Sequence, residues 1–188
     1  MENEPLTDEQ LMAAVAGGDM SGWGLLIRRH QGQALALAYR TLGNWDQAEE
    51  VVQESFLRVY RAAKRYRPEA KFTTWLYRIV VNLCLDEKRR FRRRGLNIAD
   101  LPEPQSTNPQ DNPPAVQEQN ERAQKVWEAL DRLNKRQRMA VVLHRFQGLS
   151  HQQVAEVTGW SASAVESLLV RAYRNLRREL ADLQENDG

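Results

Sequence analysis

The sequence predicts an all-α protein in which an N-terminal four-helix domain and a C-terminal four-helix domain with a helix-turn-helix are joined by a flexible linker. Apolar residues recur at the three- and four-residue spacing of helices, and no stretch shows the alternation of a strand. Capping residues and glycines mark where these helices begin and end. Five prolines between about residues 96 and 114 interrupt the pattern. With 188 residues in all, each half is close to the lower size limit for a core of its own.

Two helices are expected at the start of the chain. Thr7 and Gln10 can form a capping box for the first, which should end at the Gly17-Gly18 pair. The second is predicted from about residue 20 to residue 42 because Leu, Ala and Tyr side chains recur there at helical spacing. Gly43 is placed to end it in the left-handed conformation.

Two more helices are expected before the prolines. Asp46 and Glu49 form a second capping-box pattern, which predicts a third helix continuing to about Tyr66. A fourth is predicted from about Thr73, and it turns wholly basic over residues 88–94. The N-terminal domain is therefore expected to be a compact helical bundle.

The C-terminal half also predicts four helices. Residues 116–133 and 135–146 carry apolar side chains at helical spacing. Ser150 and Gln153 form a third capping box for a short helix, and a last helix is expected from Ser161 to about residue 183, with nothing appended after it. The predicted parts of the chain are the domain 1–95, an acidic proline-rich linker 96–115, and the domain 116–188.

The charges are distributed unevenly along the chain, although the net charge is only +2. Residues 58–94 contain thirteen Lys or Arg and three acidic residues. The first twenty residues and residues 95–121 each contain five acids and no base. A basic module of this kind is expected of a nucleic-acid-binding protein, although a run of charge alone is more often a solvated helix face.

The composition and motifs of the sequence disfavour a membrane protein, a secreted protein, a metal-binding protein and an enzyme. No stretch reaches the roughly 18 apolar residues that span a bilayer, and the acidic N-terminus does not read as a secretory signal, so a cytoplasmic protein is expected. Cys84 lies in an apolar stretch, where a buried thiol is the common case. The histidines His30, His144 and His151 show no ligand spacing, so neither a metal site nor a cofactor is predicted. Because no phosphate-binding Gly-rich loop or nucleophile with a base can be assembled either, an enzyme is disfavoured.

Residues 151–169 have the spacing of a helix-turn-helix. Ala155 lets two helices approach, Gly159 suits the turn, and Val157, Val165 and Leu168 can hold the pair together. The second helix would then present its polar residues to a DNA major groove. A helical hairpin with no DNA partner has the same spacing, but the arginines at 171, 174, 177 and 178 favour DNA.

Basic and aromatic residues interleave between positions 58 and 75. Cations follow phosphates and aromatic faces accept unstacked bases, so this mixture suits DNA that is single-stranded or melting. The alternative is that aromatic residues at helical spacing simply belong to a core. The residues concerned are Arg58, Tyr60, Arg61, Lys64, Arg65, Tyr66, Arg67, Lys71, Phe72 and Trp75.

Two segments resemble a known family. The sequences Asp-Gln-Ala-Glu-Glu-Val-Val-Gln-Glu-Ser-Phe at 46–56 and Phe-Thr-Thr-Trp-Leu-Tyr-Arg-Ile-Val-Val-Asn at 72–82 are similar to domain 2 of the extracytoplasmic-function sigma factors of bacterial RNA polymerase. The helix-turn-helix resembles their domain 4. The two motifs occur in the family's order, and the resemblance covers roughly residues 11–180.

The resemblance implies a non-enzymatic initiation factor, monomeric and without a small-molecule substrate, that binds core RNA polymerase and promoter DNA. The 46–56 helix would bind the clamp helices of the largest polymerase subunit, and the C-terminal domain would touch the polymerase flap. The residues implied for the clamp contact are Asp46, Glu49, Glu50, Gln53 and Glu54.

The resemblance also implies two DNA contacts. The N-terminal domain would recognise and open the −10 element, with the basic run after Asp86 holding backbone phosphates. The residues implied there are Arg58, Arg61, Arg65, Tyr66, Arg67, Phe72, Trp75, Arg78, Asn82, Lys88, Arg89, Arg92 and Arg93. The residues implied for the −35 element are Ser161, Ser163, Ala164, Glu166, Ser167, Arg171 and Arg174.

Glu166 and Leu168 stand where better-known family members have basic residues, so the −35 sequence cannot be carried over. Glu166 would either repel phosphate or accept a hydrogen bond from a cytosine amino group. The family also implies control by an anti-sigma factor, which is often membrane-bound and would then hold the chain at the membrane. The main alternative is a free-standing regulator that uses the helix-turn-helix alone, but it leaves the 46–56 and 72–82 motifs unexplained.

Overall fold

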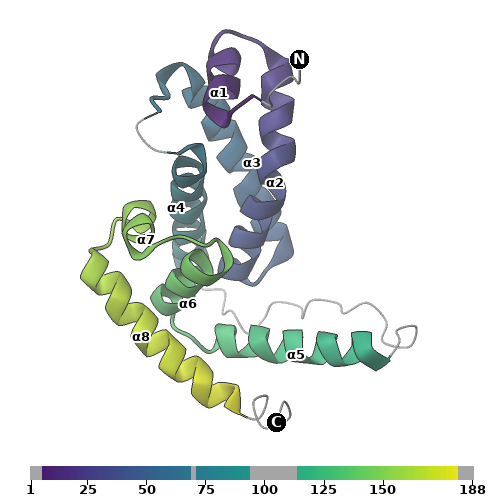
Figure 1. The fold of residues 1–188 in the computed structure, drawn as a ribbon, viewed down its shortest axis with the longest axis vertical. Helices are drawn as coiled ribbons and strands as arrows, with labels where there is room; N and C mark the ends of the chain where they lie inside the picture. The colour runs from purple at the N-terminus through teal and green to yellow at the C-terminus, as the bar shows by residue number, and fades with distance from the viewer. Residues whose placement is uncertain (1–5, 69–70, 94–113, 182–188) are drawn as a thin grey trace. The chain divides into compact units, whose positions relative to one another are not determined.

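The computed structural model describes residues 6–68, 71–93 and 114–181, and every regular element within them is helical (Figure 1). The all-α prediction is therefore confirmed. By its internal contacts the chain divides into two compact units, Met1–Asn97 with Ala155–Gly159 and Ile98–Val154 with Trp160–Gly188. The N-terminal and C-terminal helices are described separately below.

The N-terminal unit contains α1 (Asp8–Ala16), α2 (Met20–Leu42), α3 (Trp45–Ala62), the short 3₁₀ helix η1 (Ala63–Arg65) and α4 (Phe72–Arg93). Helix α2 packs against α1, α3 and α4, and α3 also packs against α4. Their facing sides form one apolar core. The largest fully buried side chains of this core are Leu11, Met12, Leu26, Leu37, Val59, Phe72, Leu76, Val80 and Val81.

The ends of α1 and α2 agree with the prediction. Gln10 N donates to Thr7 Oγ1 at 3.2 Å, and Thr7 N donates to Gln10 Oε1 at 2.8 Å, so the capping box is complete. Gly17 follows the last residue of α1. Gly43 takes φ of 75° after α2, a conformation that a residue with a Cβ adopts only with strain.

The start of α3 differs from the prediction. Its N-cap is Asn44, whose Oδ1 accepts from Gln47 N at 2.9 Å, whereas Asp46 lies in the first turn and does not cap with Glu49. The reason is geometric, because Gly43 reverses the chain and leaves Asn44 in the extended conformation that a cap requires. At its other end α3 stops at Ala62, and η1 leads into Tyr66. In the first turn of α3, Asp46 still stabilises the helix, because its negative charge lies near the helix N-terminus.

Replacing Asn44 with alanine is expected to lower the free energy of unfolding by about 1 kcal/mol, because the Gln47 amide loses its capping acceptor. Asp46→Ala should cost only a few tenths of a kcal/mol, since it removes a charge near the helix N-terminus and no capping hydrogen bond. Urea unfolding of the two variants measures the difference. If Asp46→Ala is the more destabilising, the assignment of the cap to Asn44 is wrong.

The C-terminal helices are α5 (Pro114–Asp131), α6 (Lys135–Val141), the π-helix η4 (Val142–Phe146), α7 (His151–Thr158) and α8 (Ala162–Glu179). The helix predicted over 135–146 is present and continuous, but its last five residues wind as a π-helix in place of an α-helix. Helix α8 packs against α6 and α5, and their contact faces are apolar. The predicted linker falls largely on residues outside the described part of the chain.

Candidate nucleic-acid interface

Helix α3 has one apolar face and one acidic face. Its buried side consists of Ala48, Val51, Val52, Ser55, Phe56 and Val59. The residues that the sequence predicted for the polymerase contact all lie on the other side: Asp46, Glu49, Glu50 and Gln53 are exposed, and Glu54 is half-buried. Amphipathic spacing alone therefore gathers these five polar side chains into one surface, which we call the acidic face.

Two contacts on the acidic face were not expected from the sequence. Glu54 Oε1 accepts from Arg58 Nε at 2.7 Å, and this hydrogen bond lowers the pKa of Glu54 below its usual value. Arg58, predicted to bind DNA, is thus already paired with a residue predicted to bind protein. Trp45, whose ring is half exposed at 51%, donates from Nε1 to Glu49 Oε1 at 2.9 Å. Exposed aromatic rings are enriched at protein contacts, and the sequence patterns did not single this one out.

The residues predicted for the −10 element separate into exposed and buried groups. Arg61, Arg65, Arg67, Arg78 and Asn82 are exposed, as is Arg58, while Tyr66 and Trp75 are half-buried. The rings of Tyr66 and Trp75 lie 4.9 Å apart between centroids. The aromatic cluster, as we call Tyr66, Phe72 and Trp75, therefore stands beside several exposed cations of η1 and α4.

Phe72 does not reach the surface. It is 1% exposed, and its ring lies 5.1 Å from that of His30 and 6.1 Å from that of Trp75. A side chain enclosed in this way supports its neighbours and cannot stack on a base without leaving the core. Tyr60 also lies apart from the cluster, because its hydroxyl contacts Met20 Sδ and its ring packs on Trp23 at 5.4 Å.

Three of the predicted residues line one stripe of α4. Trp75, Arg78 and Asn82 follow one another at three- and four-residue intervals, which places them on the same side of a helix. Arg78 and Asn82 are exposed, and Trp75 is half-buried at the beginning of the stripe. Lys88, Arg89, Arg92 and Arg93 belong to the same helix, but their side chains lie outside the described residues.

The predicted helix-turn-helix is present in α7 and α8. Ser150 and Gln153 form the expected capping box at 3.2 and 2.9 Å, and Gly159 takes φ of 74° in the turn. Ser161 Oγ accepts from Ala164 N at 3.2 Å and caps α8. Val165 is buried as predicted, but the neighbouring buried residue of α8 is Leu169, while Leu168 is only half-buried.

The residues predicted for the −35 element lie on the polar side of α8. Ser161, Ser163, Glu166, Ser167, Arg171 and Arg174 are exposed, and Ala164 is half-buried. Arg171 Nε donates to Ser167 O at 3.1 Å, so its side chain folds back along the helix. Val170 is 61% exposed on this helix, and it was not among the residues predicted for the −35 element. Its position three residues after Ser167 and four before Arg174 could have shown that it belongs to this side.

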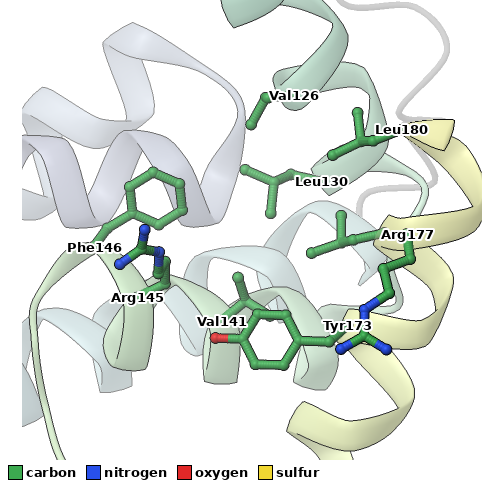
Figure 2. A pocket seen from close by; sticks show the side chains of 9 residues that line it. Val126, Leu130, Val141, Arg145, Phe146, Tyr173, Arg177 and Leu180 are labelled. Atoms are coloured by element: carbon green, nitrogen blue, oxygen red, sulfur yellow. The ribbon is translucent and has the colours of Figure 1, made fainter. Parts of the chain in front are cut away.

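The C-terminal helices also enclose an apolar groove of about 490 Å³. Figure 2 shows Arg145 and Phe146 of η4 on one side of this groove and Tyr173 and Arg177 of α8 on the other. Phe146 is 39% exposed, which is high for a large apolar ring. The remaining lining residues are Val126, Leu130, Val141, Leu176 and Leu180.

Over residues 6–68, 71–93 and 114–181, no three His, Cys, Asp or Glu side chains gather as metal ligands would. Within the same described part, no helix has the length and apolar character needed to cross a bilayer. Cys84 is buried.

Two family models match the chain. Sigma-70 region 2 matches residues 26–94, and Sigma-70 region 4 matches residues 123–176. The first match includes the acidic face and the stripe of α4, and the second includes the helix-turn-helix up to Leu176. Together they cover most of the chain.

Curated relatives and a solved structure agree with these models. The chain is 36% identical over 182 residues to the ECF RNA polymerase sigma factor SigE of Mycolicibacterium smegmatis, covering 93% of this chain and 70% of the relative. It is 33% identical to the sigma factor NccH of Alcaligenes xylosoxydans, and the match covers 96% of this chain and 98% of the relative. The structure of CnrH in complex with the cytosolic domain of CnrY is similar with a TM-score of 0.65 at 28% identity, covering 96% of this chain and 99% of that chain. The chain therefore belongs to the extracytoplasmic-function sigma factors, which are initiation factors of RNA polymerase and not enzymes.

Proposed function

We propose that three surfaces of this chain each carry one binding function of a sigma factor. The acidic face of α3 binds the clamp helices of core polymerase, the aromatic cluster with the α4 stripe opens the −10 element, and the exposed side of α8 reads the −35 element. The observation that carries this assignment is the separation of charge. Carboxylates and amides gather on α3, whereas exposed arginines flank the aromatic cluster and line α8.

DNA opening in this proposal is driven by binding energy. Phosphate contacts from exposed arginines such as Arg65 and Arg78 fix the register on the duplex without reading its sequence. Unstacking a base step costs a few kcal/mol, and an aromatic ring that receives an unstacked base returns about 1–3 kcal/mol. Trp75 and Tyr66 supply such rings, and Asn82 on the same stripe supplies an amide that can discriminate among bases.

The apolar groove of the C-terminal helices supports a protein contact on that side as well. We assign it to the polymerase flap, which the family places next to domain 4. Apolar side chains line its interior, and Arg145 and Arg177 stand beside it (Figure 2). This arrangement suits an amphipathic segment that has an apolar face and acidic edges.

Control by an anti-sigma factor belongs to the same proposal. CnrH was solved with the cytosolic domain of CnrY, and the RpoE structure from Bartonella quintana contains the anti-sigma factor NepR; that structure has a TM-score of 0.67 at 21% identity and supports the fold alone. We propose that this chain works in the cytoplasm as a monomer and is held inactive by a partner that covers its polymerase-binding surfaces. A partner anchored in the membrane would hold the chain there.

Co-purification with core RNA polymerase tests the assignment of the acidic face. Gln53→Ala/Glu54→Ala is expected to weaken binding about tenfold, because it removes two polar contacts and frees Arg58 to place a positive charge on the face. Binding is measured by titrating labelled core polymerase with each variant. Core polymerase is then used to transcribe a promoter library with and without the wild-type chain. Start sites that appear only with the chain are those that depend on it.

Gln124→Ala/Glu128→Ala is the matched control, since it removes the same side-chain types from the exposed face of α5. It should bind core polymerase as wild type does. Equal losses in the two double variants would remove the support for the acidic face. Specific duplex binding by the chain alone, with no binding to polymerase, would instead favour the free-standing regulator.

A further inference from the structure

The first turn of α1 is tied to α2 through one carboxylate. Asp8 Oδ1 accepts from Arg29 Nη1 at 3.1 Å, and Asp8 Oδ2 lies 2.8 Å from His30 Nε2. Arg29 Nη1 also donates to Leu6 O at 2.7 Å. Both oxygens of a partly buried carboxylate are thus used, which fixes the direction of Asp8 and of the His30 ring.

His30 connects this pair to the aromatic cluster. It is 7% exposed, and its ring lies 5.1 Å from that of Phe72, the first residue of α4. Phe72 in turn contacts Trp75 at 6.1 Å and Tyr66 at 6.4 Å between ring centroids. A continuous series of contacts therefore leads from Asp8 to the two rings that we propose receive unstacked bases.

Glu9 contacts the start of α4 directly, at Phe72. Its Oε1 accepts from Phe72 N at 3.5 Å, a long hydrogen bond at the N-terminus of α4, where the helix dipole favours a negative charge. The first turn of α4 has no acidic residue of its own. Burial raises the pKa of Tyr66, and the charges of Glu9 and Asp8 raise it further. Helix α1 also packs against η1, which precedes Tyr66.

We propose that Asp8 and Glu9 are positioning residues for promoter opening. They hold the start of α4 and the aromatic cluster in the arrangement that receives bases, without contacting DNA themselves. Both residues precede the part of the chain that the Sigma-70 region 2 model matches, which begins at residue 26. The inference rests on the proposed function of the aromatic cluster in opening the −10 element.

Holoenzyme assembled from core polymerase and full-length variants tests the proposal on two templates. One is a fully duplex promoter, and the other is the same promoter with a premelted −10 element. Asp8→Ala is expected to slow opening of the duplex about tenfold. Transcription from the premelted template should stay within about twofold of wild type, because its bases are already unstacked and base capture no longer has to offset that cost. Core binding should be unchanged. Glu9→Ala should slow duplex opening about threefold, and Glu9→Gln, which keeps an acceptor for Phe72 N, should recover most of this loss.

Gln10→Ala provides the matched control, because it removes one of the two capping-box hydrogen bonds of α1, from Thr7 N to Gln10 Oε1, and leaves the contacts of Asp8 and Glu9 in place. It should open the duplex promoter at the wild-type rate. Equal slowing by Gln10→Ala and Asp8→Ala, or equal losses on both templates, would show that only the stability of α1 matters and would overturn the proposal. Wild-type opening by Asp8→Ala and Glu9→Ala would overturn it too. If the wild-type holoenzyme opens no promoter, the proposed function itself fails.

Discussion

Holoenzyme containing Trp75→Ala is expected to open duplex promoters about 10 to 100 times more slowly than wild type. Trp75 begins the exposed stripe of α4, and its ring packs 4.9 Å from Tyr66, so it is the largest aromatic face beside the exposed arginines. Stacking on one base contributes about 1–3 kcal/mol, or roughly 5- to 150-fold in rate, and the expected slowing lies within this range. A fluorescent base analogue placed in the −10 element measures the opening rate directly.

Two further substitutions separate stacking from packing at this position. Trp75→Phe keeps an aromatic face and should retain most of the opening rate, whereas Trp75→Leu fills part of the space without a ring and should lose it. Urea unfolding of all three variants reports how much of the native packing is lost. If Leu supports opening as well as Phe does, Trp75 acts only as part of the core and the stacking role is wrong.

Those parts of the fold that depend on local chemistry could be predicted from the sequence. The capping boxes at Thr7 and Ser150 lie within four residues of chain, and the left-handed turns at Gly43 and Gly159 need only a residue without a Cβ. Such features form in the same way whatever packs around them. Helical periodicity likewise predicted the number and order of the α-helices in the described part of the chain, which is why the all-α class was right.

The errors occur where two local patterns compete or where the periodicity shifts by one residue. Asn44 and Asp46 are both good capping residues, and the backbone reversal at Gly43 decided between them. In α8 the leucine that is buried beside Val165 is Leu169, while Leu168 is half-buried, a difference of one position in a run of apolar residues. The π-helix η4 adds a residue to its turn, and no sequence pattern distinguishes it from a continued α-helix.

Sequence spacing could predict which residues are candidates for the site, but it could not predict which of the aromatic rings are buried. Phe72 and Trp75 stand three residues apart in one motif, yet one is 1% exposed and the other is half-buried. Burial of Phe72 depends on His30 of α2, far away in the sequence, and on the carboxylates of α1. Only tertiary contacts determine which ring remains available, so sequence spacing cannot. The domain boundaries at 95 and 115 stay a prediction.

Arg171→Ala/Arg174→Ala is expected to weaken promoter binding about a hundredfold at low salt. Both side chains are exposed on α8 beyond the helix-turn-helix turn, where they can reach phosphates, and a hydrogen bond to a charged group contributes about 1.5–3 kcal/mol. The slope of log K against log salt concentration should fall by about 0.9 for each lost phosphate contact. Holoenzyme binding to a promoter fragment across a salt series measures the affinity and the slope together.

The control for this double variant is Arg132→Ala/Arg178→Ala, which also removes two exposed arginines. Both of these contact Glu179, so part of their charge is already neutralised and the salt slope should change little. Sequence discrimination provides a second criterion, because phosphate contacts position the helix and base contacts specify it. The Arg171 and Arg174 substitutions should therefore weaken binding to every −35 variant by a similar factor. A loss confined to some −35 sequences would mean that one of these arginines reads a base, and an unchanged slope would mean that neither faces a phosphate.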